Sequence, residues 1–136
     1  MNLTAAIYNR LAGDAMLTAL LAEYNGQPAV FTTDPAPGNA VLPYIVSAGQ
    51  VAVSPSDTKT TRGRQVWRDV RCYAPSTGSA VLIEQIAERV RELLHRHRLE
   101  VSGYEVYICE ASGPVGADED DAYGRIVSLR LIAQEV

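Results

Sequence analysis

The segment AVLIEQIAERVRELLHRH, residues 80–97, carries the strongest periodic pattern in the chain. Its apolar residues recur three and four positions apart, which is the spacing of one face of an α-helix. Acidic and basic residues pair at separations of three and four on the opposite side, as on a solvated helix face. The pattern therefore predicts one long amphipathic helix whose apolar face is buried.

Strand-like segments flank this helix on both sides. Upstream, residues 44–53 are rich in β-branched and aromatic residues, and residues 65–74 alternate between two faces of different polarity. Downstream, residues 104–111 and 123–135 have the composition of two further strands. A strand pair on either side of one long helix predicts an α+β fold, with an antiparallel or mixed sheet of four to five strands and the helix on one face.

The N-terminal segment predicts a shorter helical layer on the same sheet. Apolar residues four positions apart favour a short helix that begins near Asn2. Asp14 is placed to cap a second helical segment over residues 15–23, because its side chain can accept from the first free N–H groups. Residues 29–33 then form a short strand candidate.

Length and composition indicate one domain, residues 1–136. The chain has 136 residues, of which 47% are hydrophobic and 21% charged, with a formal net charge of −4. A pI of about 5.1 disfavours a general nucleic-acid binder, since no global basic field is present. The N-terminus does not have the pattern of a signal peptide, and no apolar run approaches the roughly 20 residues of a membrane helix. We expect synthesis in the cytoplasm and no membrane partner.

Few residues combine into a pattern that carries chemistry. His95 and His97 are two positions apart on the helix, so their imidazoles point in different directions, whereas a shared metal needs a spacing of three or four. Cys72 and Cys109 each lie inside a strand-like stretch, and we expect two reduced thiols packed as small hydrophobic side chains rather than a disulfide between them. They have no CxxC partner and no neighbouring base, which argues against a nucleophile. The sequence predicts no catalytic residue, no cofactor and no metal site, and we expect a protein that is not an enzyme.

Two charged loops are candidate contact sites. The polar loop at residues 54–64 holds Lys59, Arg62 and Arg64 against a single acid. It is either a solvated hairpin loop or an arm that orders against a partner or faces passing nucleic acid. The second loop consists of four consecutive carboxylates, Asp118, Glu119, Asp120 and Asp121. These either remain solvated, bind a hard cation such as calcium, or contact a basic partner surface.

Five segments together form a recognisable pattern. They are LAGDAMLTALL (11–21), LPYIV (42–46), VWRDVRCYA (66–74), the helical residues 83–94, and YGRIVSLR (123–130). Over nearly its whole length the chain resembles the tail-completion, or tail-terminator, proteins of long-tailed bacteriophages and related prophage or gene-transfer particles. The acidic loop and the two cysteines are not features associated with this family.

The resemblance implies structural work without a cofactor. Such proteins form a ring, usually a hexamer, on the head-proximal end of the finished tail tube, where they stop tube polymerisation and join the tail to the head. The implied partners are other copies of the chain, the tail tube protein, the head-completion or connector protein, and DNA that passes transiently through the lumen. The implied location is the tail or neck of the virion, after assembly in the cytoplasm of the bacterial host.

A ring of identical subunits needs two different surfaces on each copy. Trp67 and Tyr73 lie on the less apolar side of their strand and are candidate anchors of that contact, because aromatic residues concentrate at interface centres. The alternative is that the N-terminal helix covers this side of the sheet. Two other functions stay open: a head-completion or neck adaptor protein of the same particle, and a small ligand-binding α+β domain.

Overall fold

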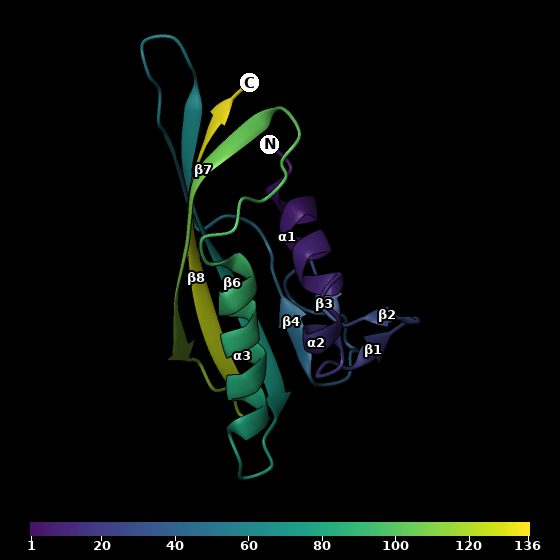
Figure 1. Ribbon diagram of the computed structural model, residues 1–136. Helices are drawn as coiled ribbons and strands as arrows, with labels where there is room; N and C mark the ends of the chain where they lie inside the picture. The colour runs from purple at the N-terminus through teal and green to yellow at the C-terminus, as the bar shows by residue number, and fades with distance from the viewer.

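A computed structural model describes residues 1–136 as three helices and eight strands (Figure 1). In chain order the elements are α1 Leu3–Ala12, α2 Ala15–Thr18, β1 Glu23–Tyr24, β2 Gln27–Pro28, β3 Val30–Phe31, β4 Tyr44–Val46, β5 Ala52–Pro55, β6 Gly63–Pro75, α3 Val81–Leu94, β7 Tyr104–Gly116 and β8 Ala122–Glu135. Six strands form one sheet in the order β3-β4-β6-β8-β7, with β5 also paired to β6. Because only β3 and β4 are parallel, the sheet is mixed, and the predicted α+β class is confirmed.

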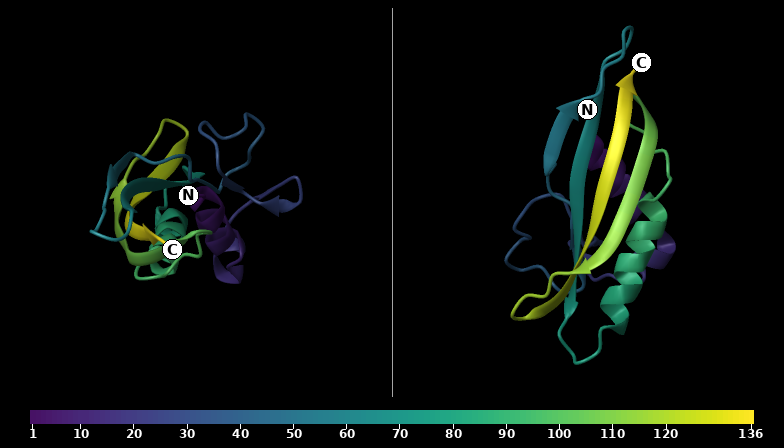
Figure 2. Two further views of the ribbon diagram at one scale, coloured as in Figure 1. Left: turned by 90° about the horizontal axis from the view of Figure 1, so that it is seen from above. Right: turned by 90° about the vertical axis from the view of Figure 1, so that its left-hand side faces the viewer.

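The long antiparallel pair of β6 and β8 forms the centre of the sheet. Its register is continuous, from Gly63 opposite Gln134 to Pro75 opposite Ala122. At roughly 3.3 Å per residue the ladder is about 40 Å long. The connection that precedes β6 and the connection that precedes β8 therefore lie at opposite ends of the molecule (Figure 2).

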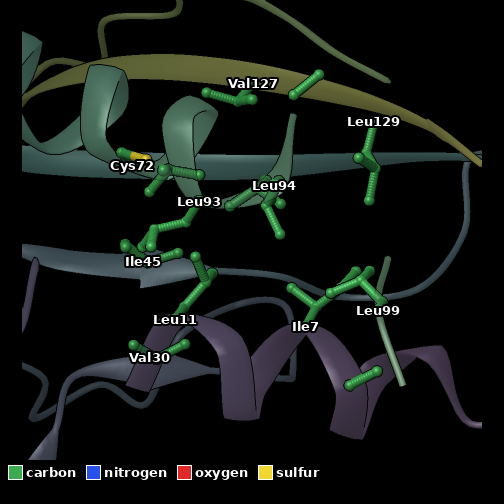
Figure 3. Packing of buried hydrophobic residues seen from close by; sticks show 14 of the residues in the cluster. Ile7, Leu11, Val30, Ile45, Cys72, Leu93, Leu94, Leu99, Val127 and Leu129 are labelled. Atoms are coloured by element: carbon green, nitrogen blue, oxygen red, sulfur yellow. The ribbon is translucent and has the colours of Figure 1, made fainter. Parts of the chain in front are cut away.

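The main core lies between one face of this sheet and the helices. Helix α3 buries the apolar face that its periodicity predicts, and α1 packs beside it with Ile7 and Leu11 directed into the same core (Figure 3). Asn2 caps α1, since its side chain accepts from the N–H of Ala5 at 3.1 Å. None of the helices has both the length and the apolar character needed to cross a membrane.

The prediction of a second helix over residues 15–23 is wrong beyond Thr18. Asp14 caps α2 as expected, but the helix has only four residues. The chain then forms a small hairpin of β1 and β2, in which Asn25 and Gly26 have φ angles of 52° and 78°. Two positive φ angles in an Asn-Gly pair form the two-residue turn that matches strand twist, so this pair belongs to a hairpin rather than to a helix end.

The predicted strand over residues 44–53 is divided into β4 and β5. The chain leaves the sheet between them, and Arg68 of β6 fills the space behind this detour. Its Nη2 donates to the carbonyl oxygen of Ser47 at 2.7 Å, and its Nη1 donates to Oε1 of Gln50 at 3.4 Å. Arg68 stands among the apolar side chains on the core-facing side of β6. A polar side chain is needed there because it binds the Ser47 carbonyl at the point where the neighbouring strand is interrupted.

Helix α3 ends at Leu94, three residues before the predicted end. His95 has an extended conformation, and its Nδ1 accepts from the N–H of Ala111 at 3.1 Å. The N–H of Arg96 donates to the carbonyl of Cys109 at 2.7 Å. These bonds occupy backbone groups on the outer edge of β7, which would otherwise be open to another strand.

Candidate interaction surfaces

The arm, residues 56–62, connects β5 to β6 and projects from one end of the molecule (Figure 1). Its base is fixed because the Asp57 carboxylate accepts from the N–H of Gly63 at 3.0 Å, and Nε2 of Gln134 donates to the carbonyl of Ser56 at 2.8 Å. Near its tip, the N–H of Thr61 donates to Oγ1 of Thr58 at 3.0 Å. The polar loop predicted from the sequence is therefore a hydrogen-bonded hairpin tip.

The three basic residues predicted for this loop occupy two environments. Lys59 and Arg62 lie on the arm, are exposed, and form no ion pair within the chain. Arg64 lies on β6 opposite Pro55, and its guanidinium is 5.9 Å from the ring centroid of Tyr104. The unpaired charge of the arm thus comes from Lys59 and Arg62.

No helix covers the other face of the sheet, which is turned away from α3 (Figure 2, right). Trp67 lies on this uncovered face and is 36% exposed. It stands in one row with Arg130 of β8 and Glu110 of β7, and the last two approach to 3.7 Å. An irregularity in β7 next to this row leaves Tyr107 and Ile108 both exposed. A Trp, a Tyr and an Arg on one open face are the residue types that dominate protein contacts.

Tyr73 does not share this exposure, which corrects the expectation that it anchors another copy. It is 8% exposed and packs in a small second core with Val46 and Ala122, with its ring 5.6 Å from that of Tyr44. Burial raises the pKa of Tyr73, and the nearby carboxylate of Glu119 raises it further. The alternative covering by the N-terminal helix is also wrong, because α1 packs with α3 in the main core.

The acidic loop lies at the opposite end of the β6–β8 ladder from the arm. Asp118 is tied to the chain, since its Oδ1 accepts from the N–H of Gly124 and from Nη1 of Arg125, each at 3.0 Å. Asp120 and Asp121 are exposed and form no ion pair. No group of three or more His, Cys, Asp or Glu side chains in the structure is arranged to hold a metal ion.

A groove between α2 and α3 was not expected from the sequence. Its volume is about 390 Å³, and it is lined by Met16, Leu20, Gln85, Glu88, Arg89 and Glu92. Met16 is 66% exposed, which is unusual for a long apolar side chain on a helix. The only sequence signal for this groove was a methionine on the polar side of a short helix.

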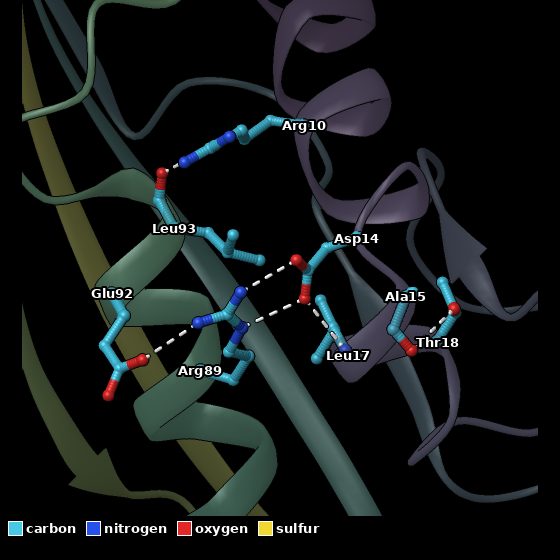
Figure 4. A network of polar contacts seen from close by, with 8 residues as sticks. All are labelled: Arg10, Asp14, Ala15, Leu17, Thr18, Arg89, Glu92 and Leu93. Carbon is cyan, nitrogen blue, oxygen red and sulfur yellow. Dashed lines mark hydrogen bonds and ion pairs between the residues drawn. The ribbon is translucent and has the colours of Figure 1, made fainter.

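Arg89 closes one wall of the α2–α3 groove (Figure 4). Its Nη2 and Nε donate to the two carboxylate oxygens of Asp14 at 2.8 and 2.9 Å, and its Nη1 donates to Glu92 at 3.1 Å. The hydrogen bond from Arg89 lowers the pKa of Asp14. Because Asp14 neutralises Arg89 and Glu88 forms no ion pair, the groove keeps an acidic rim.

His95 and the two cysteines are held by contacts within the fold and are not arranged for chemistry. His95 is bound to the β7 backbone, as described above. Both cysteines are free and buried, so the alternative of a disulfide is wrong. Burial raises the pKa of Cys72 to about 12 and that of Cys109 to about 11, which keeps both thiols protonated at neutral pH.

Comparison with known proteins adds a family and a fold. The family described as Tail completion protein gp17 matches residues 5–133. A solved chain described as the virion of a native gene transfer agent particle is 21% identical with a TM-score of 0.75, over 98% of this chain and 93% of that chain. A second solved structure is 19% identical with a TM-score of 0.63, over 98% of this chain and 94% of that chain. No curated protein matches the sequence.

Proposed function

Because the chain belongs to the family of tail completion protein gp17, we propose that it is a structural protein that forms a ring on the head-proximal end of a phage tail tube. The ring ends tube polymerisation and joins the tail to the head. The observation that carries this proposal is the family match, which spans residues 5–133 and so includes all of α3 and the whole sheet except the last two residues of β8.

The shape of the molecule supports a ring. A ring is built from head-to-tail contacts, which need two different surfaces on each copy and close when the rotation between neighbours divides a full turn. This chain has several: the uncovered sheet face with Trp67, the α2–α3 groove, and the arm. The fold that it shares with the virion component of a gene transfer agent supports a place in a phage-like particle.

The partners follow from this position. They are other copies of the chain, the tail tube protein on one side, and the head-completion or connector protein on the other. The acidic loop suits a basic protein surface better than the lumen, because its carboxylates would repel passing DNA. We place the protein in the tail or neck of the particle, assembled in the bacterial cytoplasm, with no enzymatic step and no cofactor.

Deletion of the gene from particle-producing cells tests this function. Without a terminator the tube continues to polymerise, so electron micrographs should show overlong tails. Normal-length tails beside leaky heads would instead identify a head-completion or neck adaptor protein. Light scattering and electron microscopy of the purified chain supply the second measurement, and a strict monomer that does not bind tail tubes would contradict the ring.

A further inference from the structure

The arm carries two basic side chains that form no ion pair within their own chain. Lys59 and Arg62 are exposed and form no ion pair, and the only acid of the arm, Asp57, accepts from the N–H of Gly63, so two cations and one carboxylate leave the arm with a net charge of +1. The hydrogen bonds between Thr58 and Thr61 hold the tip in one shape. An arm that is ordered before binding loses little conformational entropy when it docks.

The α2–α3 groove has the complementary character. Met16 and Leu20 supply apolar wall, while Glu88 and Glu92 place carboxylates at its rim. Arg89 adds no net positive charge, since the Asp14 carboxylate binds its guanidinium through both oxygens and neutralises it. A long basic side chain fits such a groove, because its aliphatic stem contacts apolar surface while its charged end reaches a carboxylate.

We propose that the arm of one copy docks in the α2–α3 groove of the next copy, with Lys59 and Arg62 against Glu88 and Glu92. The proposal rests on the ring described above and names the contact that closes it. A chain cannot fill its own groove in this way, because the arm projects from one end of the β6–β8 ladder, whereas α2 and α3 pack along the half of the molecule nearer its other end (Figure 1). The occupant must therefore come from another molecule.

The contact has the symmetry that a ring needs. Arm and groove are different surfaces, so each copy gives one and receives one, and no copy is paired face to face with itself. Opposite charges also determine which surfaces pair. Arm against arm and groove against groove both place like charges together, so arm against groove is favoured.

Charge reversal tests the contact. The arm variant Lys59→Glu with Arg62→Glu should weaken self-association about tenfold or more, measured by sedimentation. The groove variant Gln85→Lys with Glu88→Lys, which leaves the bonds of Arg89 to Asp14 in place, should do the same. The four changes together restore opposite charges and should recover association. Failure of the four-fold variant to recover, while its urea midpoint equals that of the wild type, would overturn the proposal.

A control separates this effect from net charge. Arg96→Glu with Arg98→Glu changes the net charge as much as the arm variant does, at two exposed positions outside the arm and the groove. This control should assemble like the wild type. If it weakens association as strongly as the arm variant, long-range charge rather than the arm explains the result, and the docking proposal is wrong.

Cysteine cross-linking gives the direct test, since both native thiols are buried. Chains with Thr60→Cys alone and chains with Gln85→Cys alone should form no disulfide dimer, whereas their mixture should. A chain with both changes should form a ladder in multiples of 14.7 kDa that stops at the size of the ring. Rings in micrographs without any ladder would reject this contact and leave the proposed function standing. A chain without rings would reject both.

Double-stranded DNA is the competing occupant of the arm. If the arm variant loses DNA binding in a gel-shift experiment while it forms normal rings and ladders, the arm serves nucleic acid, and the docking proposal is wrong. We expect the arm variant, Lys59→Glu with Arg62→Glu, to form rings less well than the wild type at low ionic strength as well as at physiological salt, because its reversed charges are repelled by the groove in both conditions.

Discussion

Arg68 is the one charged side chain that the fold buries almost completely, at 1% exposure. It has no carboxylate beside it, and burial lowers its pKa. Its bonds to the Ser47 carbonyl and to Gln50 are its only partners in the chain, and its Nε has none. The side chain therefore fills the space between β6 and the segment that separates β4 from β5, and it holds that segment by hydrogen bonds.

Replacement of Arg68 should separate its packing from its hydrogen bonds. Arg68→Ala removes both and should lower the free energy of unfolding by about 2–5 kcal/mol. Arg68→Met keeps most of the volume and also removes the cost of a desolvated charge, so it should lose clearly less. Urea unfolding of the two variants measures the difference, and equal losses would mean that packing at this site is unimportant.

Asp14 links stability to pH through its bond to Arg89. Because its pKa is lowered in the folded state, its contribution to stability is present above the unfolded-state pKa of about 3.9. That contribution is lost as the pH falls through the lower folded-state value. Asp14→Asn should therefore be less stable than the wild type at pH 7, and the difference should vanish in strong acid. Urea midpoints along a pH series test this, and a difference that is independent of pH would contradict it.

Elements whose apolar pattern repeats over many residues were predictable from the sequence. Elements whose ends are set by tertiary contacts were not. The pattern of residues 80–97 predicted α3, and alternation predicted β6 with Trp67 and Arg68 on opposite faces. The hairpin of β1 and β2 was missed because the Asn-Gly pair also ends helices. The division of β4 from β5 falls at Gly49, whose φ of 66° takes the chain out of the extended conformation, and a glycine inside a strand pattern is only a weak signal of such a break. Arg68, which supplies the hydrogen bonds behind the break, lies 17 residues beyond Val51 in sequence, so no local pattern reveals its role.

Some features of the candidate surfaces could also be predicted from the sequence, and others could not. The basic residues of the arm were evident from composition, since they stand in a long polar loop. The burial of Tyr73 was not, because Ala36 and Leu42, which pack against its cluster, lie in an irregular loop whose sequence carries no signal of where it folds. The α2–α3 groove arises where two elements distant in sequence meet, and only the structure brings Met16 next to Glu88.

Gly63 controls the base of the arm. A Cβ at this position would lie 2.5 Å from the carbonyl oxygen of Ser56 and would also meet the side chain of Gln134. Gly63→Ala should open the arm and lower stability by about 1–3 kcal/mol. Trypsin should then cleave after Lys59 faster than in the wild type. Gly116→Ala is the matched control, since a Cβ there meets nothing within 4 Å, and equal cleavage of both variants would contradict this role.

For the whole molecule, the arm should matter to assembly and not to folding. Replacement of Lys59, Arg62 and Arg64 by alanine should leave the circular dichroism spectrum unchanged, because only the stacking of Arg64 on Tyr104 is lost. Production of functional particles should fall. An unchanged titre of infectious or gene-transferring particles would show that the arm is only a solvated loop.

The position of Trp67 also provides an intrinsic optical reporter. It is the only tryptophan in the chain, and it lies partly exposed on the face that no helix covers. Its fluorescence emission depends on how much water surrounds the indole, so a shift to shorter wavelength should accompany any event that covers this face. Assembly that covers this face can thus be followed in real time without a dye or a tag. A ring that forms with no change in emission would place Trp67 on the lumen or on the outer wall.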